Sequence, residues 1–446
     1  MCRAWRDALV SQPFLWSFID GSRPSLIPCF LDRSKNAHLD VYINSCRVKE
    51  VIAYINPHID RLRSIHIELG LGGDSQFLAL RYLNAAPKLR RLNIRCRRGL
   101  NPGFTPGIVE PISSIHHLQL SGMQVTPQLV QLRHLTFISL DVSGGTLRAP
   151  LDLLSRNPLL KAIHLRGTPD RDFIEDSRHP PGSIHLPHLE VLLSELTPLA
   201  HLEALSPPRG ARIFSGFVTR QSSDYPREFS SASFPIPTSF SNLRDLQKLC
   251  LVYREVAYVK LEGPDGSITC RTCPDSPFAV ENFSGVPLEG VRDATFELTS
   301  RDRSPPATSQ PLVSRIVCGI TQLQKLELSC CDAEQVEYLL LVLHSINVCR
   351  DLKFLVLSHC VEVHGRMRRL VTMTESRKAA GMGLDTVRIV RSNAELYKDT
   401  FKQEDVRRLE RAIGTFEYVQ AEQGRAERSS LRFDPEIGIS QPSLFL

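Results

Sequence analysis

The sequence contains two short patterns whose residue types could support chemistry. The first is Gly70-Leu71-Gly72-Gly73-Asp74, which lies between an expected strand and an expected helix. A glycine-rich turn in that position lets the backbone approach a dinucleotide phosphate closely. However, the run reads G-x-G-x-x-S, and Arg95-Cys96 stands where an acidic residue that binds the ribose would end the next strand. The pattern therefore favours a plain turn, and we expect no nucleotide cofactor.

The second pattern, Cys270-Arg271-Thr272-Cys273, has zinc-knuckle spacing but lacks the second close pair of ligands that such a site needs. The sequence also contains no Walker loop, no nucleophile elbow and no H-E-x-x-H motif. The 14 histidines are spread singly apart from His116-His117, and no set of serine, histidine and acidic residue can be singled out. We therefore expect no metal and no catalytic residue, so that the protein is not an enzyme.

Composition and charge argue against several other classes of protein. Of the 446 residues, 42% are hydrophobic and 23% are charged, which is typical of a globular chain. The 54 basic and 48 acidic side chains give a net charge of +6, which is too mild to predict a nucleic-acid or membrane partner. The twelve cysteines are scattered, and the N-terminus has no signal-peptide core. We expect a cytoplasmic or nuclear protein.

One apolar pattern recurs along the chain and is expected to position the other residues. It reads apolar, two variable positions, apolar, one variable position, apolar, as in Leu62-Arg63-Ser64-Ile65-His66-Ile67. Further copies begin at Leu89, Ile115, Leu135, Leu160, Leu189, Leu246, Val291, Leu323, Leu352 and Leu384, and those at 189 and 291 are weak. The first six copies start 27, 26, 20, 25 and 29 residues apart, which is close to the period of leucine-rich repeats. The last three start 29 and 32 residues apart, which predicts longer helices or loops there.

The segments between these strands indicate helices that stop near a proline. Residues 74–86 and 149–154 are predicted helices, and Asp332 begins another whose apolar face is formed by Val336, Leu339, Leu340 and Leu343. A strand, a turn, a helix and a proline make one unit of a solenoid, whose apolar face is buried only when units stack. The predicted fold class is α/β, a leucine-rich-repeat solenoid with a curved parallel sheet, outer helices and a short all-α segment at the N-terminus.

Composition shifts along the chain suggest its domain organisation. We assign residues 1–20 to the N-terminal all-α segment, 21–60 to a connecting segment, 61–397 to the solenoid, and 398–446 to a C-terminal helix and polar tail. Proline, serine and polar residues predict irregular insertions near 206–241, 262–290 and 300–311. Alternation around Pro264-Asp265-Gly266 predicts a β-hairpin.

Side-chain alternation assigns the residue between the last two apolar positions of each strand to the concave sheet surface, where solenoids generally bind partners. In the first half these residues are His66, Asn93, Gln119, Ser139 and His164, flanked by Arg91, Arg95, His117 and Arg166; in the second half they are Cys250, Thr295, Glu327, Val356 and Arg388. Arginines there suit an acidic or phosphorylated patch on a partner, and the histidines predict binding that changes between pH 6 and 7. A solvated face without a ligand is the alternative.

The first residues carry a family resemblance. Cys2-Arg3-Ala4-Trp5-Arg6 places Cys2, Trp5 and Leu9 on one helical face, Pro13 ends the helix, and Leu15-Trp16 follows. This resembles the second half of an F-box, and the segments around 30–34 and 39–43 resemble the link to degenerate leucine-rich repeats in fungal F-box proteins. The usual first F-box helix, an L-P-x-E-like segment, does not precede Cys2 in this sequence.

The resemblance implies a non-catalytic substrate-recognition subunit of a cullin-type ubiquitin ligase. The F-box remnant would dock on a Skp-type adaptor that links to a cullin, and the repeats would hold a protein substrate. The docking residues implied are Cys2, Arg3, Trp5, Arg6, Leu9 and Trp16, with both tryptophans expected mainly as core residues. A free-standing repeat scaffold that has lost adaptor docking is the alternative function.

Overall fold

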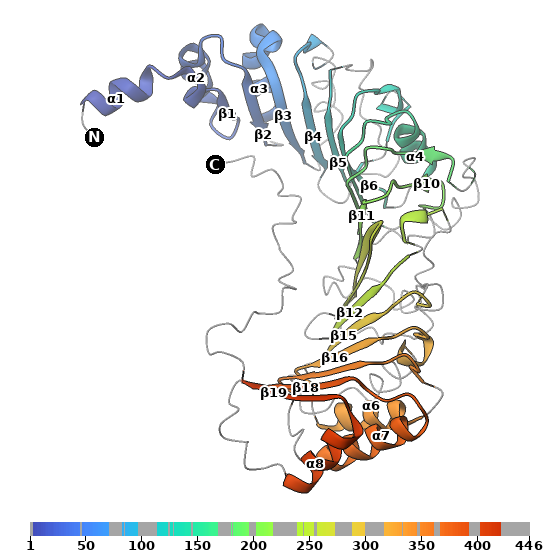
Figure 1. Ribbon diagram of the computed structural model, residues 1–446. Coiled ribbons are helices and arrows are strands. Elements are labelled where there is room, and N and C mark those ends of the chain that lie inside the picture. The colour runs from blue at the N-terminus through green and yellow to red at the C-terminus, as the bar shows by residue number, and fades with distance from the viewer. Residues whose placement is uncertain are drawn as a thin grey trace. The chain divides into compact units, whose positions relative to one another are not determined.

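The computed structural model describes residues 3–44, 47–70, 83, 85–96, 114–123, 125–127, 129–143, 146–167, 180, 182–195, 202–216, 239–243, 245–253, 257–272, 288–298, 316–331, 333–345, 348–360, 366–391 and 402–420. They form a mixed α/β protein in which most strands belong to a large, mostly parallel sheet (Figure 1). The chain divides into two compact units. Unit 1 comprises Met1–Asp245, Glu262–Cys273 and Ser284–Val286; unit 2 comprises Leu246–Leu261, Pro274–Phe283 and Pro287–Leu446.

Unit 1 begins with short helices and then becomes a ladder of strands. Its first elements are α1 (Arg3–Val10), η1 (Pro13–Trp16), β1 (Phe18–Asp20), η2 (Pro24–Leu26), α2 (Ile27–Ser34), β2 (Leu39–Ile43), α3 (Val48–Ile55) and η4 (Asn56–Arg61). Strands then follow at β3 (Leu62–Leu69), β4 (Arg91–Cys96), β5 (His117–Ser121), β6 (Phe137–Asp141), β7 (Ala162–Arg166), β9 (Val191–Glu195), β11 (Arg212–Gly216) and β14 (Gly266–Thr272). Between them lie η6 (Leu129–Gln131), α4 (Arg148–Ser155), η10 (Ser241–Leu243) and the separate pair β8 (Ile184–His185) and β10 (Leu205–Ser206).

The strands of unit 1 pair in parallel in the order β1, β2, β3, β4, β5, β6, β7, β9, β11, β14. The repeated apolar positions explain this arrangement. On β3, Ile65 and Ile67 are fully buried while His66 between them is partly exposed, and the same alternation holds on β4, β5 and β7. Each buried aliphatic side chain contributes roughly 1.5–3 kcal/mol, so the two inward positions of each strand hold the ladder together.

Unit 2 repeats the plan with longer helices. Its elements are β12 (Lys248–Tyr253), most of β13 (Ala257–Gly263), β15 (Asp293–Leu298), β16 (Lys325–Ser329), α6 (Ala333–His344), β17 (Phe354–Ser358), α7 (Met367–Ala379), β18 (Thr386–Arg391), α8 (Gln403–Ala412) and β19 (Thr415–Gln420). Strands β12, β15, β16, β17, β18 and β19 pair in parallel in that order. Figure 1 shows α6, α7 and α8 gathered along these strands.

Several strands lie outside the segments where the sequence predicts them. The parallel sheet begins at β1, because β1 pairs with β2 and β2 with β3, so residues 21–60 contribute a strand rather than a simple connection. The predicted irregular insertion at 206–241 contains β11, which pairs in parallel with β14, the second strand of the hairpin predicted around Pro264-Asp265-Gly266. Strand β19 follows the predicted C-terminal helix. These strands carry fewer apolar positions in the repeat pattern, and they form because a neighbouring strand offers its backbone N–H and C=O groups.

Other predicted elements agree with the structure. The eleven copies of the repeat pattern coincide with β3, β4, β5, β6, β7, β9, β12, β15, β16, β17 and β18. Helix α4 matches the segment predicted before Asn157-Pro158, the predicted apolar face of α6 is buried, and β13 and β14 flank Pro264-Asp265. Helix 74–86, the 300–311 insertion and the tail from 421 lie outside the described residues, apart from 83 and 85–86.

Across the described part of the chain, no helix has both the length and the apolar character that crossing a membrane demands.

Candidate interaction face and N-terminal helix

The residues predicted between the buried positions of unit 1 form one continuous row across the sheet. The register aligns them side by side in the order Tyr42, His66, Asn93, Gln119, Ser139, His164, Leu193 and Phe214. We call this set the middle row. It includes all five residues that the sequence predicts there, together with Tyr42, Leu193 and Phe214, which sequence reasoning missed. Register in a parallel sheet brings together residues roughly 20–30 positions apart, because equivalent positions of successive strands become neighbours.

His66 lies in a compact polar group at one end of the middle row. Its ring centroid is 5.1 Å from that of Tyr42, and its Nε2 is 3.8 Å from Oε1 of Glu68. Burial lowers the pKa of His66 below its ordinary value; Glu68 opposes this shift and Arg95 adds to it. Burial, with the nearby Glu68 carboxylate, raises the pKa of Tyr42. Tyr42 and His66 are therefore held in their neutral forms near pH 7.

Further along, the side chains brace one another across strands. The Asn93 side-chain amide donates to Oε1 of Gln119 at 3.0 Å. His117, one position before the buried Leu118, stacks on Phe137 with ring centroids 5.8 Å apart. Burial lowers the pKa of His117, and the positive Arg91 lowers it further. The face is thus a partly ordered surface rather than a set of free side chains.

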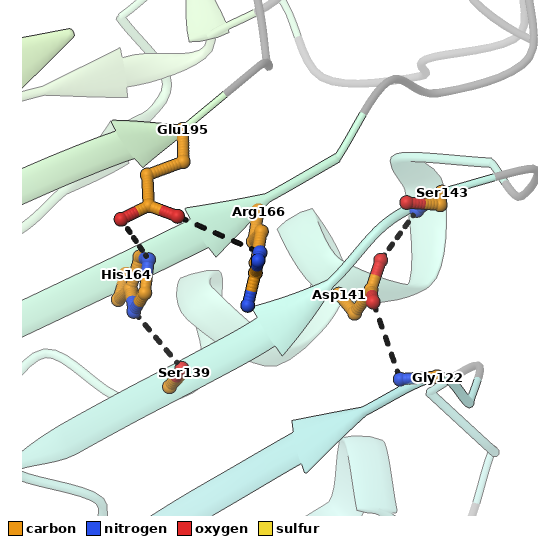
Figure 2. A network of polar contacts seen from close by, with 7 residues as sticks. All are labelled: Gly122, Ser139, Asp141, Ser143, His164, Arg166 and Glu195. Atoms are coloured by element: carbon orange, nitrogen blue, oxygen red, sulfur yellow. Dashed lines mark hydrogen bonds and ion pairs between the residues drawn. The ribbon is translucent and has the colours of Figure 1, made fainter. Parts of the chain in front are cut away.

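A connected polar network spans β6, β7 and β9 (Figure 2). Nδ1 of His164 lies 3.2 Å from Oγ of Ser139, and Nε2 of the same ring lies 3.5 Å from Oε1 of Glu195. The other oxygen of Glu195 is 3.5 Å from Nε of Arg166. Glu195 was not singled out from the sequence, because it follows a weak copy of the repeat whose strand continues through Leu192 to Ser194.

Ser139, His164 and Glu195 are the residue types of a nucleophilic triad, which the sequence did not reveal. Their geometry favours bracing over catalysis. Ser139 is only 7% exposed, so its hydroxyl offers little access to a substrate. The gap of 3.5 Å between His164 and Glu195 is longer than an ordinary hydrogen bond, whereas a relay needs a close base–acid pair.

Beside this network, a second carboxylate orders the loops at the ends of the strands. Asp141 accepts hydrogen bonds from the backbone N–H of Gly122 at 3.2 Å and of Ser143 at 3.1 Å (Figure 2). Gly167 lies next to them with φ of +99°, and a Cβ there would lie 2.0 Å from the Ser143 hydroxyl oxygen. Only glycine fits this position. Asp141 therefore serves the fold, and its charge is already engaged.

The predicted arginines differ in their availability. Arg166 is paired with Glu195, and Arg95 lies beside Glu68 in register, so both have an acidic neighbour within the protein. Arg91 is exposed and lies beside His117 in register. Of the three, Arg91 is the one that the structure leaves facing solvent without a neighbouring carboxylate in register.

The N-terminal helix presents apolar side chains to solvent. Trp5 is 69% exposed and Phe14 64%, and Leu9, one turn after Trp5, is 39% exposed. Trp5 is therefore not the core residue that the sequence suggested, because no described element covers this side of α1. Arg3 and Arg6 are also exposed, with Arg6 3.6 Å from Asp7, and Cys2 lies outside the described residues.

Trp16 behaves differently and anchors this segment. Its indole N–H donates to the Leu9 carbonyl oxygen at 3.0 Å, and its ring meets Phe30 edge-on at 5.3 Å. The Arg33 guanidinium lies 4.3 Å from the ring centroid. Trp16 thus joins the end of α1 to α2, and the exposed apolar residues are presented on a fixed support.

In unit 2 the corresponding row is Cys250, Thr295, Glu327, Val356, Arg388 and Glu417. Glu327 accepts a hydrogen bond from the Ser358 hydroxyl at 3.2 Å, and Nε of Arg388 is 3.5 Å from Oε2 of Glu417. The first five residues are those predicted from the sequence. Arg388 thus has an acidic neighbour on the adjacent strand, and Glu327 has a hydrogen-bond donor there.

The two patterns considered for cofactors and metals fall largely on undescribed positions. Residues 71–74 of the glycine run and Cys273 are outside the described residues, and the side chain of Cys270 is not described. In the portion of the chain that is described, no three histidine, cysteine or acidic side chains group together as metal ligands would.

A scan of known protein-family models found no model that matches this chain, and a search of curated proteins found no relative.

Proposed function

We propose that this protein is a leucine-rich-repeat solenoid that acts as a non-catalytic substrate-recognition subunit of a cullin-type ubiquitin ligase. The observation that carries the proposal is the apolar surface of α1 and η1, with Trp5 69% and Phe14 64% exposed. Large exposed aromatic side chains are common at interaction sites, because their burial against a partner removes apolar area from water. The resemblance of this segment to the second half of an F-box is the reason that we propose a Skp-type adaptor as the partner.

The anchoring of Trp16 supports this role for the helix. A docking helix binds well when it is already held in its bound conformation, because little conformational entropy is then lost on association. Trp16 supplies that restraint through its contacts with Leu9, Phe30 and Arg33. In this proposal Trp16 positions the segment, and Trp5, Leu9 and Phe14 contact the adaptor.

The sheet face of unit 1 is the proposed substrate surface. Period and register are consistent with stacked repeats, and in such a stack we expect the middle row to lie on the concave side. Binding energy there would come from a few anchor residues surrounded by polar groups. Paired charges such as Arg166 with Glu195 would contribute orientation and exclusion of water more than affinity.

The test is co-purification of the full chain with a recombinant Skp-type adaptor, followed by a binding titration. We expect the double substitution Trp5→Ala with Phe14→Ala to weaken adaptor binding by at least about tenfold, because truncating an interface aromatic typically removes more than ~1 kcal/mol. Leu159→Ala is the matched control, since Leu159 is 47% exposed but lies after α4 rather than on α1. Its adaptor affinity should equal that of the wild type.

The alternative function, a free-standing repeat scaffold without adaptor docking, gives the opposite result. In that case the wild-type chain fails to co-purify with the adaptor at micromolar concentrations while unfolding cooperatively on heating. Equal loss of binding in Leu159→Ala would also count against the proposal, because it would indicate a general effect of truncating exposed apolar residues.

A further inference from the structure

A second row of side chains runs across the strands of unit 1, beside the middle row. The register aligns Arg91, His117, Phe137, Ala162, Val191 and Arg212 on β4, β5, β6, β7, β9 and β11. The two arginines at its ends are exposed, and the four residues between them are partly exposed. We call these six residues the Arg91–Arg212 row.

The centre of this row is apolar. Phe137, Ala162 and Val191 follow one another on neighbouring strands, and Leu193 and Phe214 of the middle row lie side by side on β9 and β11, two positions after Val191 and Arg212. All five are partly exposed rather than buried in the core. A cluster of half-buried apolar side chains with a polar rim is the arrangement found at the centre of protein interfaces, where charged residues are depleted.

The ends of the row are basic, and their charges are not used within the described structure. No ion pair joins Arg91 or Arg212 to a carboxylate among the described residues, whereas Arg166, in the row on the other side of the middle row, pairs with Glu195. That other row also carries the carboxylates Glu68 and Asp141. An acidic ligand is therefore attracted more to the Arg91–Arg212 row than to the opposite one, where Arg95 and Arg166 already have acidic neighbours.

We propose that the Arg91–Arg212 row binds an extended segment of a partner protein in which apolar side chains lie between two acidic residues. The row crosses five gaps between strands of about 4.8 Å each, which gives a length of about 24 Å. An extended chain advances about 3.3 Å per residue, so acidic residues about six to eight positions apart would reach both arginines. Alternate residues between them would face Phe137, Ala162 and Val191.

This inference rests on the proposed function, because it takes the sheet face of unit 1 as the partner-binding surface and names the chemistry of the ligand. It also changes which basic residues are proposed to contact an acidic partner. Arg212 lies in a segment that the sequence suggested was an irregular insertion, and it joins the row only because β11 pairs with β9. Arg95 and Arg166 fall outside the row.

The experiment is selection of random linear peptides of about twelve residues, long enough to span the row, on the immobilised full chain. Enriched peptides are then synthesised with a fluorescein label and titrated by fluorescence anisotropy. We expect enrichment of two acidic residues about six to eight positions apart with apolar residues at alternate positions between them. Arg91→Glu combined with Arg212→Glu should weaken these peptides by at least about tenfold, and replacing their acidic residues with lysine should restore affinity for the variant.

Arg133→Glu is the matched control, because Arg133 is exposed but precedes β6 and lies off the sheet face. Peptide affinity should be unchanged in this variant, and heat unfolding of all variants should match the wild type. Enrichment of basic or uncharged peptides, absence of enrichment, or equal weakening by Arg133→Glu would overturn the proposal. Adaptor binding is measured through α1 and uses no peptide, so failure of adaptor docking and failure of peptide binding are separate results.

Discussion

Units 1 and 2 are built on the same strand pattern but cover their strands differently. In unit 2, where the repeat starts are 29 and 32 residues apart, the connections contain α6 and α7, of 12 and 13 residues. In unit 1, where one spacing is only 20 residues, β5 and β6 are connected through the three-residue η6. In these connections the longer spacing accommodates a helix of several turns and the shortest one does not.

The segments that connect the strands are also held by different polar residues in the two units. In unit 2, Arg377 is fully buried and donates to the carbonyl oxygens of Leu343 at 3.2 Å, Val348 at 3.0 Å and Cys349 at 2.5 Å, which tie α7 to the end of α6. In unit 1, the buried Asn157 accepts from the Leu135 N–H at 3.0 Å. Its amide donates to the carbonyl oxygens of Leu132 and Leu153 at 2.9 and 2.7 Å. In unit 2 a guanidinium therefore holds the long helices together, and in unit 1 a neutral side-chain amide holds the shorter helix and turns together.

Removing the buried guanidinium should give the largest loss of stability. Arg377→Met leaves the carbonyl oxygens of Leu343, Val348 and Cys349 without their donor, and we expect unit 2 to lose roughly 3–5 kcal/mol. Hydrogen–deuterium exchange should show faster exchange in α6 and α7. Arg408→Met is the control, since Arg408 on α8 also pairs with α7, through Glu375, but its side chain is partly exposed rather than fully buried. If both substitutions accelerate exchange equally, Arg377 is not the brace that distinguishes unit 2.

A smaller loss is expected from the equivalent change in unit 1. Asn157→Ala removes three hydrogen bonds, and we expect a loss of about 2–3 kcal/mol because the Leu135 N–H and two carbonyl groups become unpaired in a buried site. Faster exchange should appear around α4 and the start of β6 and leave α6 and α7 unchanged. The exposed Asn36 provides the control through Asn36→Ala. Faster exchange across α6 and α7 in Asn157→Ala would contradict the view that each unit has its own brace.

The smallest expected effect is a dependence of stability on pH that arises in unit 1. The pKa values of His66 and His117 are lowered, mainly by burial, so the folded state binds their protons less readily than the unfolded state. Stability is then complete above a pH of about 6.5 and is lost as the pH falls below this value towards the lowered pKa values. We expect the free energy of unfolding, measured in urea, to be flat from pH 7.5 to 6.5 and to decrease below that.

His66→Gln with His117→Gln should flatten this decrease, and His344→Gln on α6 in unit 2 should leave it unchanged. An identical decrease in the double variant would remove these histidines as its cause. The direction of the pKa shifts also revises the pH sensitivity expected from the sequence, because a lowered pKa moves the change for His66 and His117 to a lower pH than that of a free histidine. Any effect on partner binding should follow the same shift.

The sequence predicted much of the local structure because the strand signal is local. Buried side chains such as Ile65 and Ile67 alternate with His66, and this period of two can be read without knowing what lies nearby. The middle row followed from the same alternation. Strand β11 was missed because the prolines and serines on either side of it suggest a loop, and its pairing with β9 depends on a neighbour that is distant in the sequence.

The candidate sites show the limit of that reading. By itself, the sequence determined which residues point out of the sheet, because alternation along a strand is a property of the backbone. The tertiary structure decided which of these residues are exposed and unpaired enough to contact a partner. Register placed Glu195 beside Arg166 and aligned Arg91 with Arg212, and the absence of a described element over α1 left Trp5 exposed. Charge pairing and burial depend on neighbours contributed by other strands, and such neighbours are fixed only when the chain has folded.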